Sequence, residues 1–340
     1  MADKKTKKAR LPRVAVIGTG GTIASIGVGP LDITNYTANG KILKADELVA
    51  RVPELALVAD VYAVPFKNIP STQLGWPEWK EMLRIADALV AKDRKLDGIV
   101  ITHGTATLEE TAYFLSLTSK VKVPIVVLGA QRPASALSGD GPMNLLNAVR
   151  VAGSPQAKGL GALVVMNDEI HAAREVTKTS TSRLQTFRTA DFGVIGHADG
   201  DAICMYRKPL RRLAPDTEFD VRKLKELPRV DVAYAYAGAD GTAIRAFVAA
   251  GAKGIVTAGF APGFVTPSMV EALEEARAKG VVVVMSSRAG SGRVFATTPM
   301  VTRGFLTADN LTPQKARILL SLALTVTSKP REIERIFATY

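Results

Sequence analysis

The chain has 340 residues, of which 47% are hydrophobic and 22% are charged, with a formal net charge of +12. This composition is typical of a globular protein large enough for two domains, and it excludes a disordered or fibrous chain. We find no apolar run of about 18 residues, no secretory signal behind the basic N-terminus, and a single cysteine, Cys204, which excludes an intrachain disulfide. We therefore expect a cytoplasmic protein.

Basic residues are concentrated at the N-terminus and between Arg207 and Lys225. They could attract a polyanion or an anionic substrate. The alternative is a disordered, solubilising tail over residues 1–10 and a solvated linker, and we favour it because no aromatic residues alternate with the basic ones. We accordingly expect neither a nucleic-acid nor a membrane partner.

Strand-like and helix-like segments alternate over residues 11–207, which we predict to form an N-terminal domain. Short apolar runs predict strands at Val14–Gly18, Leu57–Val64, Gly98–Ile101, Pro124–Leu128 and Ala162–Met166. Periodic segments predict helices at Glu78–Val90, Leu108–Leu117 and Met143–Val151. Thr107 and Glu110 have the spacing of a capping box at the start of the second of these helices.

Residues 208–229 are rich in charge and proline and predict a linker, followed by a C-terminal domain over residues 230–340. There the pattern predicts strands at Val230–Ala235, Gly254–Thr257 and Val281–Ser286, and helices at Ala243–Ala250, Ser268–Lys279, Pro313–Val326 and Arg331–Phe337. Such alternation indicates three-layer α/β domains with largely parallel sheets, which bind ligands beyond the carboxyl ends of their strands. Thr22 and Thr105 both lie just past such ends.

The Gly-rich turn that ends in Thr22 allows the backbone to approach a ligand closely. It lacks the third glycine of a dinucleotide-binding motif, and the residues after it resemble a loop, so we reject a nucleotide cofactor. Taken alone, the turn is better interpreted as structural than as catalytic.

A second Gly/Thr segment, His103-Gly-Thr105-Ala106, joins a predicted strand to a predicted helix. If Thr107 caps the helix, the hydroxyl of Thr105 remains free to react. We interpret His103 as a hydrogen-bonded histidine at the end of the strand rather than as a general base, because no acidic partner is close in sequence.

A third segment follows a buried strand and ends at Lys178, between two threonines. A lysine that is desolvated beside a threonine can act as a base, although a surface lysine is the commoner case. Asp168 and His171 in this segment have no helical ligand pair, so we predict no metal site.

These segments resemble the bacterial L-asparaginase/glutaminase family, most closely its type II branch, over nearly the whole chain from Leu11 to Tyr340. The resemblance rests on several motifs in the same order: Thr19–Ala24, Thr102–Thr105, Glu109–Leu115, Ala130–Pro133, Asp140–Pro142, Val165–Asp168, Val176–Thr179 and Pro313–Arg317. It implies a large N-terminal three-layer α/β domain with a mixed sheet and a smaller flavodoxin-like C-terminal α/β domain. It also implies catalysis without a cofactor by a homotetramer, a dimer of dimers that shares sites between subunits.

The resemblance also implies roles for individual residues. Thr22 matches the nucleophile and Tyr36 the tyrosine beside it, while Thr105 and Lys178 match members of a second catalytic triad. Substrate binding is assigned to Gly21, Ser71, Thr72, Gly104, Ala106 and Phe264, with Ser71 matching the serine that binds the substrate α-carboxylate.

The departures from the family pattern concern the substrate's α-ammonium group. Ala106 replaces an aspartate, Thr72 a glutamine, and Phe264 an asparagine that the partner subunit supplies; a partner glutamate has no counterpart within residues 289–298. An ammonium group requires carboxylates or carbonyls to replace its water. Without the aspartate, we also predict that the pKa of Lys178 is lowered.

Three hypotheses follow. The first is an amidohydrolase that acts on a small carboxylate-bearing amide or ureide without an α-ammonium group, such as a dicarboxylic acid monoamide. The second is a conventional L-asparaginase or glutaminase, and the third a non-catalytic binding protein on the same scaffold. Retention of Thr22, Tyr36, Thr105 and Lys178 argues against the third.

Overall fold

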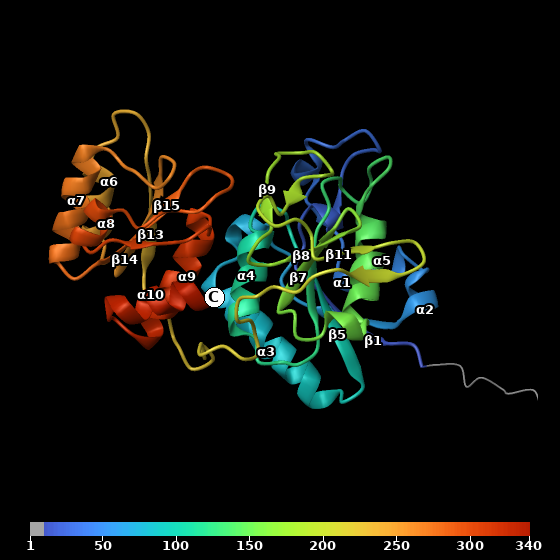
Figure 1. The fold of residues 1–340 in the computed structure, drawn as a ribbon. Helices are drawn as coiled ribbons and strands as arrows, with labels where there is room; N and C mark the ends of the chain where they lie inside the picture. Colours follow the sequence, from blue (N-terminus) through green and yellow to red (C-terminus); the bar gives the residue numbers. More distant parts are fainter. Residues whose placement is uncertain (1–9) are drawn as a thin grey trace, which may run out of the picture.

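The computed structural model describes residues 10–340, folded into the two α/β domains that the sequence predicts (Figure 1). Most of the predicted basic tail lies outside the described residues. Its last residue, Arg10, is described, and its Nη2 lies 2.8 Å from Oδ2 of Asp97. Within the described range, the helices are too short or too polar to cross a membrane.

A mixed eight-stranded sheet forms the centre of the N-terminal domain, in the order β12-β11-β8-β7-β6-β5-β1-β4. The strands from β7 to β4 are parallel, whereas β8, β11 and β12 each run antiparallel to a neighbour. The strands are β1 Arg13–Gly18, β4 Asp60–Pro65, β5 Leu96–Thr102, β6 Ile125–Leu128, β7 Ala162–Met166, β8 Glu169–Ala172, β11 Gly196–Ala198 and β12 Ile203–Met205.

Helices cover both faces of this sheet, with α3 and α4 on one side and α1, α2 and α5 on the other (Figure 1). They are α1 Ala45–Ala50, α2 Leu55–Val58, α3 Trp76–Lys92, α4 Leu108–Thr118 and α5 Gly141–Ala152. Short elements line the loops: η1 Thr22–Ala24, η2 Tyr36–Asn39, η3 Ser71–Gln73, η4 Pro155–Ala157, and the two-stranded sheets β2 Ser25–Ile26 with β3 Lys41–Ile42 and β9 Thr177–Lys178 with β10 Phe187–Arg188.

One predicted strand, Leu57–Val64, is partly wrong. Its first residues belong to α2, and β4 begins only at Asp60. Leu55 and Ala59 are both buried while Leu57 is 78% exposed. Burial at positions i and i+4 is the pattern of a helical turn that packs against the core. A short run of apolar residues does not distinguish such a turn from a strand, so the sequence did not reveal it.

The C-terminal domain contains a four-stranded parallel sheet in the order β13-β14-β15-β16. Its strands are β13 Val230–Tyr234, β14 Gly254–Gly259, β15 Val282–Ser287 and β16 Leu306–Thr307. The helices are α6 Thr242–Ala249, α7 Pro267–Ala278, α8 Thr298–Thr302, α9 Pro313–Val326 and α10 Pro330–Thr339. Helices α6 and α7 pack together, whereas α9 packs on the sheet and also on α4 of the N-terminal domain (Figure 1).

The segment between β12 and β13, which includes the predicted linker over residues 208–229, has no helix or strand among its described residues. It is, however, not a solvated one. Phe219 and Val221 are fully buried, and Lys120 Nζ donates to the carbonyls of Pro215 and Thr217 at 3.2 and 2.7 Å. Lys120 therefore fastens the charged stretch to the N-terminal domain, while the ring of Phe219 packs against Tyr340 of the C-terminal domain, with 4.9 Å between the ring centroids.

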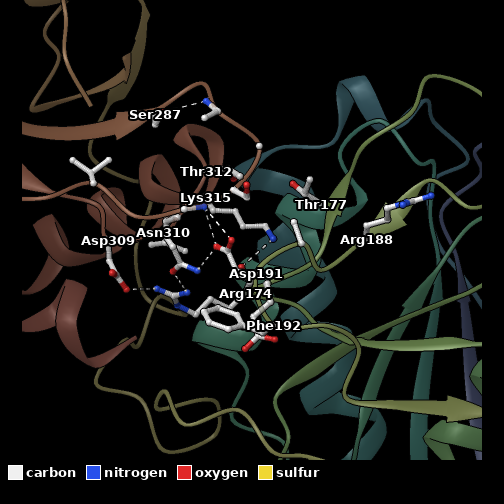
Figure 2. A pocket seen from close by; sticks show the side chains of 18 residues that line it. Arg174, Thr177, Arg188, Asp191, Phe192, Ser287, Asp309, Asn310, Thr312 and Lys315 are labelled. Carbon is white, nitrogen blue, oxygen red and sulfur yellow. Dashed lines mark hydrogen bonds and ion pairs between the residues drawn. The ribbon is translucent and has the colours of Figure 1, made fainter. Parts of the chain in front are cut away.

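Polar side chains join the two domains on one side of α9 (Figure 2). Arg174 Nη1 donates to Asn310 Oδ1 at 2.7 Å. Asp191 accepts hydrogen bonds from the backbone N–H of Gly292 at 3.0 Å and from Asn310 Nδ2 at 3.2 Å. The hollow between these groups measures about 30 Å³, enough for about one water molecule. We therefore regard this region as a structural junction.

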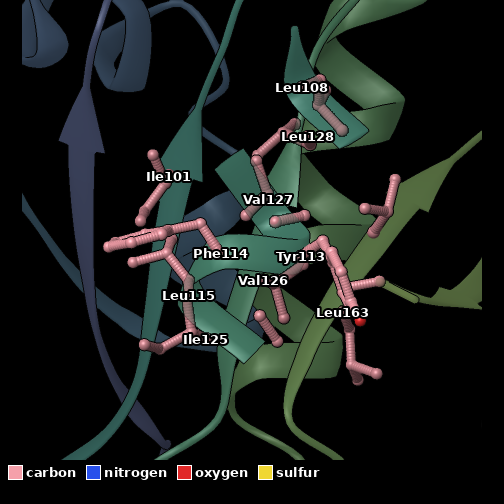
Figure 3. Close-up of a cluster of buried hydrophobic side chains, with 14 of the residues drawn as sticks. Ile101, Leu108, Tyr113, Phe114, Leu115, Ile125, Val126, Val127, Leu128 and Leu163 are labelled. Atoms are coloured by element: carbon pink, nitrogen blue, oxygen red, sulfur yellow. The ribbon is translucent and has the colours of Figure 1, made fainter. Parts of the chain in front are cut away.

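Part of the larger hydrophobic core lies between the N-terminal sheet and α4 (Figure 3). Side chains from β5, β6 and β7, among them Ile101, Val127 and Leu163, contact Tyr113 and Phe114 of α4, and these residues are at most 1% exposed. Burial of one such aliphatic or aromatic side chain stabilises a fold by about 1.5–3 kcal/mol. This packing fixes the N-terminal end of α4, beside which the candidate site lies.

Candidate active site

The loop after β1 brings Thr22 to the carboxyl edge of the large sheet. The loop turns through Gly21, whose φ of 82° favours glycine. A Cβ atom on Gly21 would lie 2.4 Å from the Cα of Gly104, so only glycine allows this loop to contact the loop after β5. Thr22 Oγ1 lies 2.9 Å from the hydroxyl oxygen of Tyr36. The structure thus brings this predicted pair together.

A second pair lies just beyond β5. Thr105 is buried, and Lys178 Nζ donates to its Oγ1 at 2.7 Å. Burial lowers the pKa of Lys178 and outweighs the negative charge of Glu109, which raises it. The direction agrees with our prediction, although burial is the main cause. A neutral lysine can accept the proton of a neighbouring hydroxyl, so this pair is arranged for proton transfer.

His103 is engaged on both ring nitrogens. The indole N–H of Trp79 donates to Thr111 Oγ1 at 2.8 Å, and Thr111 Oγ1 lies 2.8 Å from His103 Nε2. Because the carbonyl of Gly104 can only accept, the proton of the neutral ring lies on Nδ1, which donates to it at 2.8 Å, and Nε2 accepts from the Thr111 hydroxyl. Burial lowers the pKa of His103 to about 4. These contacts confirm the prediction that His103 is a hydrogen-bonded histidine at the end of the strand.

The loop containing Ser71 is fastened beside the two pairs. Thr107 Oγ1 donates to the carbonyl of Ser71 at 2.7 Å, and a Cβ on Gly104 would lie 2.6 Å from Ser71 Oγ. The predicted capping box is therefore wrong. Thr107 occupies the N-cap position without a side-chain cap bond, because its hydroxyl holds the Ser71 loop, and Glu110 instead pairs with Arg317 Nη2 at 3.2 Å.

These loops enclose a cavity of about 400 Å³, a suitable size for a small organic molecule. Lys41 and Lys178 are the charged side chains that line it, and within the described part of the chain no carboxylate does so. All predicted site residues except Phe264 line this cavity. The complete lining is Gly21, Thr22, Ser25, Tyr36, Thr37, Gly40, Lys41, Ile42, Pro70, Ser71, Thr72, Gly104, Thr105, Ala106 and Lys178.

Phe264 lies elsewhere, in the loop after β14 of the C-terminal domain. It forms an isolated antiparallel bridge with Phe260, and its side chain is 48% exposed. Within one chain it does not line the cavity. Its predicted role requires a second subunit and stays a prediction.

Reasoning from sequence missed the role of Glu109. This residue is 5% exposed, and its carboxylate accepts hydrogen bonds from the backbone N–H of Lys178 at 2.5 Å, from Thr177 Oγ1 at 3.0 Å and from Gln314 Nε2 at 2.6 Å. The only available signal was an acidic residue on the buried face of a predicted helix. Its partners are 68 to 205 positions away, beyond the reach of spacing rules.

Comparison with known proteins agrees with this architecture. Residues 13–211 match the model of the asparaginase N-terminal domain, and residues 229–337 match that of the glutaminase/asparaginase C-terminal domain. The crystal structure of a probable cytoplasmic L-asparaginase from Campylobacter jejuni superposes with a TM-score of 0.92 at 39% identity, covering 97% of this chain and 100% of that one.

Similar sequences carry related names. L-asparaginase 2 of Bacillus subtilis is 42% identical over 335 residues, which cover 98% of this chain and 88% of the relative. L-asparaginase 2 of Escherichia coli is 42% identical over 97% of this chain and 94% of its own length. The glutaminase-asparaginase of Pseudomonas fluorescens is 41% identical over 100% of this chain and 93% of its own length. The chain therefore belongs to the asparaginase/glutaminase family and is an asparaginase-like amidohydrolase.

Proposed function

We propose that Thr22 is the nucleophile of this amidohydrolase. Its Oγ1 attacks the amide carbon, and either Tyr36, which gives up its own proton as it accepts that of Thr22, or the pair formed by Lys178 and Thr105 assists the proton transfer. The C–N bond then breaks as the nitrogen gains a proton and leaves. Water attacks the resulting threonine ester, which releases a carboxylic acid and restores the hydroxyl. The distances of 2.9 Å from Thr22 to Tyr36 and 2.7 Å from Lys178 to Thr105 support this assignment.

Stabilisation of the oxyanion comes from the Thr105 loop. Gly21 and Gly104 bring backbone groups close to the position where the carbonyl would bind, and bound water completes the set. Ser71 holds a carboxylate at the other end of the substrate, while Thr72 and Ala106 form the neighbouring wall.

The proposal for the substrate rests on the cavity lining, which contains no carboxylate among the described residues. An α-ammonium group would enter a site lined by Lys41 and Lys178 without an anionic partner from the same chain. Each missing charged hydrogen bond costs about 1.5–3 kcal/mol, so two or three of them reduce specificity several hundredfold or more. The favoured substrate is therefore a small carboxylate-bearing amide or ureide without an α-ammonium group.

Conventional hydrolysis of asparagine or glutamine is the second candidate. The names of relatives that are 41–42% identical over nearly the whole chain favour it over the first candidate. The cavity lining favours the first. A non-catalytic ligand-binding homologue remains as a third reading, which the retained Thr22, Tyr36, Thr105 and Lys178 contacts argue against.

The assembly and location belong to the same proposal. We propose a homotetramer, a dimer of dimers, in which Phe264 of the partner subunit faces the cavity. The position of Phe264 on the C-terminal domain, half exposed and away from the cavity of its own chain, supports this arrangement. The name of the Campylobacter jejuni protein supports a cytoplasmic location.

An ammonia-release screen separates the candidates. Purified enzyme is offered asparagine, glutamine, succinamate, malonamate and ureido acids, with Thr22→Ala as the control. Faster turnover of succinamate or malonamate than of asparagine is the expected result. Fast turnover of asparagine would instead establish the second candidate, and activity that survives Thr22→Ala would refute the nucleophile. A folded enzyme that releases no ammonia from any of them would favour the third reading.

A further inference from the structure

Two neighbouring side chains of helix α9, Gln314 and Lys315, hold the segment that leads to the proposed base Lys178. Lys315 Nζ is fully buried and donates to the carbonyls of Ala173 at 2.9 Å and Arg174 at 3.2 Å, and also to that of Val176. Three carbonyls satisfy all the donors of one ammonium group. The chain just before Lys178 is thus anchored to the C-terminal domain.

Gln314 holds the next two residues through Glu109 of α4. Its Nε2 donates to Glu109 Oε1 at 2.6 Å, and the same oxygen accepts from Thr177 Oγ1 at 3.0 Å. The other carboxylate oxygen accepts from the Lys178 backbone N–H at 2.5 Å. One buried carboxylate therefore connects α4, the short strand β9 and α9.

We propose that Glu109 is a positioning residue which, together with Gln314, makes the C-terminal domain of each chain part of the support for its own Lys178. The inference rests on the proposed function, because it requires Lys178 to take part in proton transfer. It concerns the domain of the same chain, whereas the proposed role of Phe264 concerns the partner subunit.

The geometry explains why such support is needed. Strand β9 has two residues and, among the strands of residues 10–340, pairs with β10 alone, so the sheet does little to fix Lys178. Its side chain must nevertheless hold Nζ at 2.7 Å from Thr105 Oγ1, and a displacement of about 1 Å can cost a factor of about 100 in rate. Three hydrogen bonds to one carboxylate fix the backbone from which that side chain extends.

Charge adds a second effect. Ala106 stands where the family pattern has an aspartate, and Glu109 is the group whose charge raises the pKa of Lys178 against its burial. Lys315 lies on the other side of this carboxylate, on α9, and Glu109 raises its pKa as well. Glu110, one residue further along α4, faces Arg317 instead. Removal of the Glu109 charge should therefore lower the pKa of Lys178.

The test compares Glu109→Gln with Glu110→Gln, which removes a charge from the same turn of α4 and breaks a contact with the same helix α9. The pKa of Lys178 is measured without turnover, from the pH dependence of its acetylation by acetic anhydride. Trypsin does not cleave after acetyl-lysine, so acetylated Lys178 yields the peptide over residues 175–183, whereas unmodified Lys178 yields residues 175–178. Ammonia release gives kcat and KM in parallel.

In Glu109→Gln we expect a lower Lys178 pKa and a kcat reduced roughly 10- to 100-fold with a smaller change in KM. In Glu110→Gln both quantities should remain near wild type. A folded Glu109→Gln enzyme with unchanged Lys178 pKa and unchanged kcat would overturn the proposal, as would an equal effect in Glu110→Gln. If Glu109→Gln does not fold, Gln314→Met must lower kcat, and an unchanged kcat there overturns the proposal.

Failure of the proposed function gives a different result. If Thr22→Ala keeps full activity while acetylation of Lys178 still shifts in Glu109→Gln, the mechanism is wrong and the positioning role stands. If Thr22→Ala is inactive and the Lys178 pKa and kcat are insensitive to Glu109→Gln, the mechanism stands and the positioning role fails.

Discussion

Replacement of Ala106 by aspartate should move the selectivity of the cavity toward α-amino acid amides. Ala106 lines the cavity, and it follows Thr105, whose Oγ1 lies 2.7 Å from Lys178 Nζ. A carboxylate at this position would supply one charged hydrogen bond to an α-ammonium group, worth about 1.5–3 kcal/mol. Since about 1.4 kcal/mol corresponds to a factor of ten, the ratio of kcat/KM for asparagine to that for succinamate should rise roughly 10- to 150-fold.

The assay measures initial rates of ammonia release from the two substrates at concentrations below KM. Ala106→Asn is the matched control, because it has nearly the same size without the charge. The new carboxylate should also raise the pKa of Lys178, so the pH at which the lysine becomes neutral should move upward in Ala106→Asp alone. A ratio that stays constant in Ala106→Asp, or that rises equally in Ala106→Asn, would refute the argument from charge.

Three further predictions concern the hydrogen bonds around the site. Tyr36→Phe removes the partner of Thr22 and should reduce kcat about 10- to 100-fold with an unchanged melting temperature; wild-type kcat would exclude Tyr36 from proton transfer. The pKa of His103 is about 4 when folded and near 6.5 when unfolded, so the protein should lose about 3 kcal/mol of stability as the pH falls from 6.5 to 4. Urea midpoints across this range test the loss, and an equally steep loss in His103→Gln would contradict its assignment to His103. Lys315→Met leaves three buried carbonyls without their donor and should destabilise the fold by about 3–5 kcal/mol in urea, whereas an unchanged midpoint would contradict the anchoring role.

The sequence predicted the regular parts of the fold because their signals are local. Helix α9 was predicted with its observed bounds, Pro313–Val326, because its apolar periodicity starts at a proline and spans several turns. The strands β8, β11 and β12 were missed. They are three or four residues long, and their antiparallel pairing depends on distant partners rather than on an apolar run.

The sequence predicted the part of the candidate site that lies directly after the ends of strands. Thr22 and Thr105 follow β1 and β5, which are adjacent and parallel, so their meeting at one edge followed from the alternating pattern. The roles of Tyr36 and Ser71 came only from the family resemblance, whereas the threonines on either side of Lys178 had already made it a candidate base. The contacts of Glu109 with Thr177 and Gln314 were not predictable, because they depend on how α4 packs between the large sheet and α9.

Ala106 and Thr72 differ in one respect from the residues around them. Both are exposed to the cavity, whereas Thr105 and Ser71, the residues before them, are buried and held by hydrogen bonds or close contacts. Substitutions at exposed positions usually change stability by no more than about 0.5 kcal/mol. These two positions can therefore vary freely during evolution, or in a small combinatorial library, while the fold and the reactive threonines are retained. A lineage could acquire a new amide as its substrate in a few mutational steps, without first gaining stability elsewhere.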